Sequence, residues 1–137
     1  MKKIKKNELI SLRAFFNALN IVGLPTQKSL ALLKLHRKVE EVQNENAEMQ
    51  KSLIEKFEIP ILDGGKIDTT HENFKAYVDA YSVMVSEEID LTPYCILTEE
   101  EAMVAVQKID APLAVIDAIA KILTAEVAES DNNNNNN

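Results

Sequence analysis

Apolar residues recur at steps of three and four along most of this chain, which is the spacing of one face of an α-helix. The first apolar stripe predicts a helix over 7–20, with Asn7 as its N-cap. This stripe consists of Leu9, Leu12, Phe16 and Leu19. Gly23 and Pro25 predict a break after it, because proline disfavours helical geometry in the residue before it.

A long helix is predicted next, from Gln27 to Phe57 with Thr26 as its cap, since this range contains neither glycine nor proline. About 31 residues at a rise of 1.5 Å each span roughly 46 Å. The first half is apolar over a wide arc that includes Leu30 and Leu33. The second half is polar except for a narrow seam with the 3-4 alternation of a heptad repeat. The seam consists of Leu32, Leu35, Val39, Val42, Asn46, Met49 and Leu53.

Asn46 occupies an a-type position of this seam, where a buried asparagine can fix the register or the number of helices. Two interpretations stay open. The seam packs on a later helix of the same chain, which is favoured because fewer than four clean heptads are present, or it pairs with another chain in a homo-oligomer. The exposed side of the second half of the long helix is the predicted contact surface for a partner. Its candidate residues are Asn46, Met49, Gln50 and Leu53.

The segment after the long helix predicts a hairpin and a returning helix. Short apolar runs flank Asp63-Gly64-Gly65, which supplies the positive φ angles of a tight turn and predicts a two-stranded ribbon over 58–68. Thr69 and Glu72 are typical of a capping box, and they predict a helix to Glu87 that runs antiparallel to the long one. The alternation over 89–91 predicts a third strand in the same ribbon.

The last third of the chain predicts two more helices. Thr98 and Glu101 form a second capping box that opens a helix to about Ile109. Asp110 is the predicted cap of a final apolar helix. The asparagine-rich segment 129–137 is predicted to be disordered, since it holds too few apolar residues for a core.

These elements predict a mainly α fold with a small β-ribbon (α+β), in one domain over 1–128. The long central helix forms an antiparallel helical hairpin tipped by a β-hairpin. Residues 40–91 protrude as this hairpin, and the other helices form a base. Only three glycines and four prolines interrupt the 137 residues, which favours long helices over a many-stranded sheet.

Charge is unevenly distributed along the chain. Residues 1–38 carry nine Lys/Arg against Glu8 alone, a balance of +8, whereas the remainder carries six basic and 21 acidic residues, a balance of −15. Such a chain can pair its halves internally, stack head to tail, or offer its basic end to an acidic partner.

The beginning of the chain bears on its location. Its basic first residues are not followed by an unbroken apolar run, so neither a secretory signal nor a membrane span is predicted, and no membrane contact is expected. The single Cys95 cannot form an intramolecular disulfide and is compatible with a reducing compartment. A cytoplasmic protein is therefore expected.

No catalytic, cofactor or metal site is predicted. His36 lies among basic residues that repel a divalent cation, and His71 lies beside Glu72 in a predicted first helical turn. Neither histidine has the spacing of a zinc motif. Cys95 stands in an apolar context that is typical of an inert buried thiol.

The order of these features resembles a family of small uncharacterised proteins of tailed bacteriophages and prophages, known as a domain of unknown function. The similarity covers roughly 6–123. It rests on Leu24-Pro25, the helix end Leu53-Ile54-Glu55-Lys56-Phe57, the hairpin Asp63-Gly64-Gly65-Lys66-Ile67, and Glu87-Glu88-Ile89-Asp90-Leu91 before Leu97-Thr98. The resemblance implies a non-enzymatic accessory of virion or tail assembly. It would contact phage or host proteins in the bacterial cytoplasm or in the virion.

An alternative is a small regulator that binds nucleic acid through the basic residues 1–38. The two helices around Gly23 have the order of a helix-turn-helix. The segment 27–33 is too apolar to offer a row of base-reading side chains, so protein–protein contacts are favoured.

Overall fold

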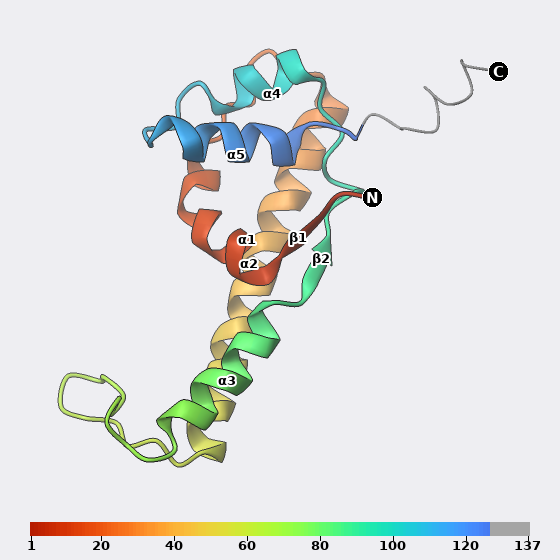
Figure 1. Cartoon of the computed structure of the whole chain (residues 1–137). Helices are drawn as coiled ribbons and strands as arrows, with labels where there is room; N and C mark the ends of the chain where they lie inside the picture. Colours follow the sequence, from red (N-terminus) through yellow and green to blue (C-terminus); the bar gives the residue numbers. More distant parts are fainter. Residues whose placement is uncertain (127–137) are drawn as a thin grey trace.

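The computed structural model describes residues 1–126, so the predicted disordered tail, 129–137, lies outside the described residues. The predicted class is confirmed: the fold is mainly α with a small antiparallel sheet (Figure 1). The elements are β1 (Lys3–Lys5), α1 (Lys6–Leu12), the 3-10 helix η1 (Arg13–Ala18), α2 (Thr26–Lys56), α3 (Phe74–Val85), β2 (Glu88–Asp90), α4 (Glu99–Val106) and α5 (Leu113–Leu123).

The long helix α2 joins two separate hydrophobic clusters. Its first half packs into a core with α1, η1, α4 and α5, and we call this part the base. The largest fully buried side chains of the base are Leu9, Leu35, Leu91, Leu97, Ile119 and Leu123. Beyond Val42 the helix leaves this core and runs beside α3, as Figure 1 shows. We call residues 43–87 the stalk.

The first predicted helix, 7–20, is divided into α1 and the 3-10 helix η1, and the predicted helix starts at Asn7 and Asp110 are wrong. Asn7 lies inside α1 and accepts a hydrogen bond only from the adjacent Glu8 N–H, because β1 runs straight into the helix and Lys5 is the N-cap. Asp110 does not cap the last helix, since the carbonyl of Pro112 accepts the first N–H groups and α5 begins at Leu113. The long helix itself was predicted to within one residue at each end.

The helix α3 begins at Phe74, so the predicted capping box of Thr69 and Glu72 is wrong. The Asp68 carboxylate instead accepts hydrogen bonds from the N–H and the hydroxyl of Thr70, at 3.0 and 2.6 Å, and holds this segment in a turn. Asn73 donates its side-chain N–H to the Phe57 carbonyl at 2.9 Å. This bond joins the start of α3 to the end of α2.

The predicted third strand exists, but it lies in a different sheet. Over Glu88–Asp90, β2 pairs antiparallel with β1 at the base, in the register Lys3 to Asp90, Ile4 to Ile89 and Lys5 to Glu88. Each cross-strand pair is either apolar or of opposite charge, which stabilises this pairing. At the tip of the stalk, the predicted ribbon is reduced to one antiparallel bridge between Ile61 and Ile67.

The two oppositely charged parts of the chain pair with each other inside the base. The Arg13 guanidinium donates two hydrogen bonds to the Glu40 carboxylate, at 3.0 and 2.8 Å. The Lys28 ammonium contacts Glu101, and the capping box of α4 holds the same carboxylate, with Thr98 N–H donating to it at 2.9 Å. The predicted box of Thr98 and Glu101 is thus confirmed.

Acid is expected to weaken the base through Glu101. Hydrogen bonds from Lys28 and from the Thr98 backbone hold the pKa of Glu101 below its usual value. A lowered pKa in the folded state gives stability that is present above the unfolded pKa, about 4.3 for glutamate, and is lost as pH falls through the folded pKa. Glu101→Gln should therefore lower the free energy of unfolding at pH 7 and reduce its loss on acidification.

Urea unfolding followed by circular dichroism between about pH 7 and pH 3 measures this effect, since that range spans the titration of glutamate. Glu100→Gln is the matched control, because Glu100 is exposed in the same helical turn. An equal loss of stability on acidification in Glu101→Gln and in the unsubstituted protein would contradict the assignment.

Candidate functional site

The stalk has its own hydrophobic cluster. Leu53 on α2, Ile59 after it and Tyr77 on α3 are buried together. Partly buried neighbours surround them, namely Ile54, Phe57, Ile67, Phe74, Ala80, Tyr81 and Met84. Leu53 of the predicted seam therefore packs on α3 of the same chain, as the intramolecular interpretation predicts, and pairing of the seam with another chain stays a prediction.

Two hydrogen bonds of the same kind set the register of the two stalk helices. The Asn46 side-chain N–H donates to the Tyr81 hydroxyl at 3.1 Å, and Gln50 donates to the Tyr77 hydroxyl at the same distance. Both pairs are spaced by four residues on each helix, so they form two steps of one antiparallel ladder. The Tyr77 and Tyr81 rings stack with centroids 6.1 Å apart. Asn46 thus fixes a helix register, as a buried asparagine in a seam can do.

Met49 does not follow the heptad spacing into the interface. An α-helix has 3.6 residues per turn, so positions spaced by the heptad average of 3.5 drift by about 20° per repeat. After Asn46 this drift brings Gln50 toward α3 and leaves Met49 at the edge of the interface. The Met49 side chain is 46% exposed.

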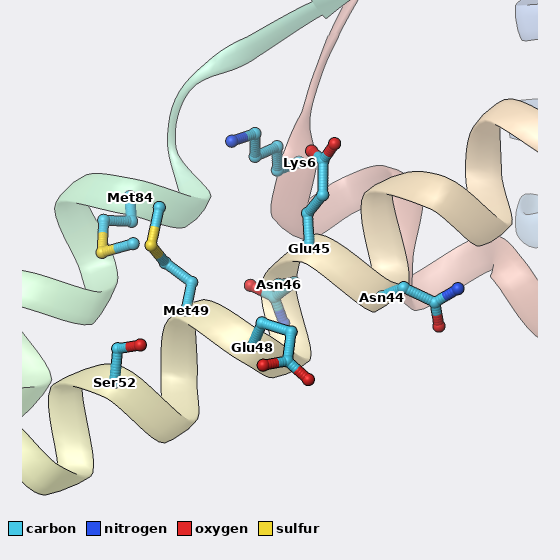
Figure 2. Close-up of a pocket in the computed structure, with 8 residues that line it drawn as sticks. All are labelled: Lys6, Asn44, Glu45, Asn46, Glu48, Met49, Ser52 and Met84. Atoms are coloured by element: carbon cyan, nitrogen blue, oxygen red, sulfur yellow. The ribbon is translucent and has the colours of Figure 1, made fainter.

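A groove lies where Met49 reaches the surface. It has a volume of about 440 Å³ between α2, the end of α3 and the start of α1. Its lining residues are Lys6, Asn44, Glu45, Asn46, Glu48, Met49, Ser52 and Met84. Figure 2 shows the Met49 and Met84 thioethers close to each other between the two helices, with the polar side chains around them. We call this site the methionine groove.

The surroundings of the methionine groove are acidic. Glu45 and Glu48 are exposed on its α2 side. The Lys6 ammonium on its other side is paired with Glu87 at 3.2 Å. Residues 43–87 carry nine acidic and four basic side chains, a balance of −5. A cationic segment is therefore attracted to the stalk.

The four predicted contact residues are divided between two faces. Asn46 and Met49 line the methionine groove, and Gln50 and Leu53 face α3. Asn46 belongs to both faces, because its amide also donates to the Tyr81 hydroxyl of α3. Contact of these residues with a partner stays a prediction. Sequence reasoning missed Lys6 as a lining residue, because the pairing of β1 with β2 brings the start of α1 to this place. Sequence reasoning also missed Met84, whose side chain reaches the groove through the packing of α3 on α2.

The two histidines and Cys95 lie apart from the methionine groove. The His36 ring is 2.8 Å from the Asn17 side-chain oxygen, and His71 accepts a hydrogen bond from the Asn73 N–H. Burial raises the pKa of the Cys95 thiol to about 12. Within residues 1–126, no three His, Cys, Asp or Glu side chains gather in the way a metal ion would require. Over the same range, no helix has both the length and the apolar character needed to cross a membrane.

Comparison with protein-family models finds no match for this chain, and comparisons with curated proteins and with solved structures find none either.

The ladder should have a measurable coupling energy. Asn46→Ala and Tyr81→Phe each remove one side of the same hydrogen bond, so their destabilisations should not add. A double-mutant cycle from urea unfolding should give a coupling of about 0.5–1.5 kcal/mol, the net value of one such bond. Asn44→Ala with Tyr81→Phe is the control cycle, since Asn44 is exposed. A coupling near zero for Asn46 with Tyr81 would refute the ladder as the register-setting contact.

Proposed function

We propose that this protein is a non-enzymatic assembly accessory that binds another protein through the methionine groove. The observation that carries the proposal is the exposed Met49 beside the partly buried Met84, in a groove of 440 Å³ on the acidic stalk. Methionine side chains are flexible and polarizable, so they adapt to the apolar anchor of a partner.

The chemistry of the groove defines the partner segment. The two thioethers favour an apolar anchor such as leucine, methionine or phenylalanine. Glu45 and Glu48 favour lysine or arginine beside that anchor, because opposite charges across an interface steer association. The expected partner segment therefore carries an apolar anchor between basic residues.

The four methionines of the chain allow a direct test by NMR of ¹³C-labelled methyl groups. Met49 and Met84 lie in the groove, whereas Met103 is exposed on α4 and serves as an internal control. A peptide with an apolar anchor between lysines should shift the Met49 and Met84 signals and leave Met103 unchanged. A control peptide with the same anchor between glutamates should shift neither signal. In the Met49→Glu variant, the lysine-containing peptide should no longer shift the Met84 signal. Equal shifts at Met103, or none at Met49, would overturn the proposal.

The resemblance to small proteins of tailed bacteriophages and prophages supports virion or tail assembly as the process served. Affinity purification of this protein from phage-producing bacteria tests this part of the proposal. A virion or tail component should accompany the unsubstituted protein and Met103→Glu, and it should be lost with Met49→Glu. Recovery of host proteins alone in all three samples would contradict a role in assembly.

The nucleic-acid alternative is less well supported, because several cations of the basic segment 1–38 are already paired with acidic side chains of this chain. Lys6, Arg13 and Lys28 contact Glu87, Glu40 and Glu101. Lys3 and Lys5 lie opposite acidic residues in the sheet.

We therefore expect no measurable binding to nonspecific duplex DNA at low salt. Fluorescence anisotropy with a labelled duplex checks this expectation. Binding that weakens steeply as salt rises would favour the alternative, since release of counterions gives that dependence. Loss of the same binding in a Lys34→Glu/Arg37→Glu variant would then assign it to the exposed cations of α2.

A further inference from the structure

A second apolar groove lies in the base, away from the stalk. It has a volume of about 310 Å³ and is formed by the first turns of α2, the end of η1 and the loop after it. Its lining residues are Phe16, Leu19, Ile21, Thr26, Ser29, Leu30, Leu32, Leu33 and His36. Ile21 and Leu30 are each 51% exposed, and Leu33 is 46% exposed. Three large aliphatic side chains therefore meet solvent in one hollow, which we call the leucine groove.

Cations border the leucine groove. Lys34 and Arg37 are exposed, and each lies four residues after Leu30 or Leu33, on the same face of α2. The segment 26–39 contains four Lys/Arg and no Asp or Glu. An apolar occupant with acidic neighbours therefore matches this surface.

The tip of the stalk, residues 58–68, carries apolar side chains with acidic neighbours and so matches the leucine groove. Ile61 and Leu62 are adjacent in sequence, and their side chains are 66% and 50% exposed. Asp63 follows Leu62 directly and is exposed, and Glu58, three residues before Ile61, is exposed too. Residues 58–68 carry three acidic side chains and Lys66, a balance of −2. Backbone hydrogen bonds hold the hairpin in shape, including one from the Leu62 N–H to the Lys66 carbonyl at 2.6 Å. The tip is already ordered, so docking it costs little conformational entropy.

The tip and the leucine groove of one molecule cannot meet. About 23 residues of continuous helix separate Leu33 from the end of α2, which is roughly 35 Å at 1.5 Å per residue. The loop that carries the tip projects sideways from the end of the stalk that lies far from the base, as Figure 1 shows. Only the groove of a second molecule is within its reach.

We propose that copies of this chain associate head to tail, with Ile61 and Leu62 of one copy seated in the leucine groove of the next. Asp63 and Glu58 then approach Lys34 and Arg37. The two surfaces differ, so reciprocal use of both contacts between two copies closes a two-fold dimer, whereas one-way use builds a larger ring or an open filament. The proposal uses neither Met49 nor Met84 and goes beyond the partner binding proposed above.

Sedimentation velocity of the full chain tests the contact through two single-site variants. Leu62→Asp disables the tip, and Leu33→Glu disables the groove. Both sites are exposed, so both variants should keep the circular dichroism spectrum of the unsubstituted protein. The unsubstituted protein should associate as its concentration rises, and more strongly at low salt. Each variant alone should stay monomeric, with self-association weakened at least roughly tenfold by burial of a charge in place of a leucine.

An equimolar mixture of the two variants gives the decisive measurement. One variant keeps an intact groove and the other an intact tip, so the mixture should form a one-to-one dimer and nothing larger. The two damaged sites both carry a new carboxylate and cannot pair with each other. Met103→Glu, exposed on α4, is the matched control and should associate like the unsubstituted protein.

Three outcomes would overturn the proposal. The unsubstituted protein could stay monomeric at low salt and high concentration. Leu33→Glu alone could abolish association while Leu62→Asp has no effect, which would assign the groove to a symmetric contact or to another protein. The mixture could also fail to form the dimer. Met49→Glu should leave association unchanged, so failure of the methionine groove and failure of this contact are distinguishable.

Discussion

The structure depends on one straight helix whose apolar face serves two separate cores. The first half of α2 supplies Leu32, Leu35 and Val39 to the base, and its end supplies Leu53 to the stalk cluster. Between them the interface is polar, and the hydrogen bonds of Asn46 and Gln50 to two tyrosines keep α3 in register. A change of register would leave these groups without partners at a partly buried interface, which is costly. The two cores are therefore held at a fixed spacing.

Features encoded by neighbouring residues were predictable from the sequence. The long helix was recognised because no glycine or proline interrupts it, and the capping box of Thr98 and Glu101 was recognised because both partners lie in one helical turn. Predictions that ignored distant contacts were wrong. The N–H of Lys6 bonds to the Glu87 carbonyl, and this bond, together with the pairing of β1 and β2, determines where α1 begins. A pairing between residues so far apart leaves no local pattern to recognise.

The candidate sites likewise combine residues that local sequence patterns reveal with residues that only distant contacts bring together. Asn46 and Met49 were predicted as contact residues because they lie on the one seam of the polar half of α2. The side chain of Met84 reaches the groove only through the antiparallel packing of α3 against α2, which periodicity does not reveal. The exposed Leu30 and Leu33 were placed on a wide apolar arc of α2. Whether such an arc is covered depends on the number of elements packed around it, and here the base leaves part of it open.

The pairing of Lys3 with Asp90 has a consequence for the order in which the protein folds. The helices of the stalk are joined by residues 57–73, so their contacts are nearer in sequence than those of the base, and contacts near in sequence form more rapidly. The base needs residues from both ends of the described chain, since α1 and α5 contribute to one core. During synthesis the stalk can therefore form while the base is still incomplete. The core around Leu32 and Leu35 therefore stays incomplete until α5 has been synthesised.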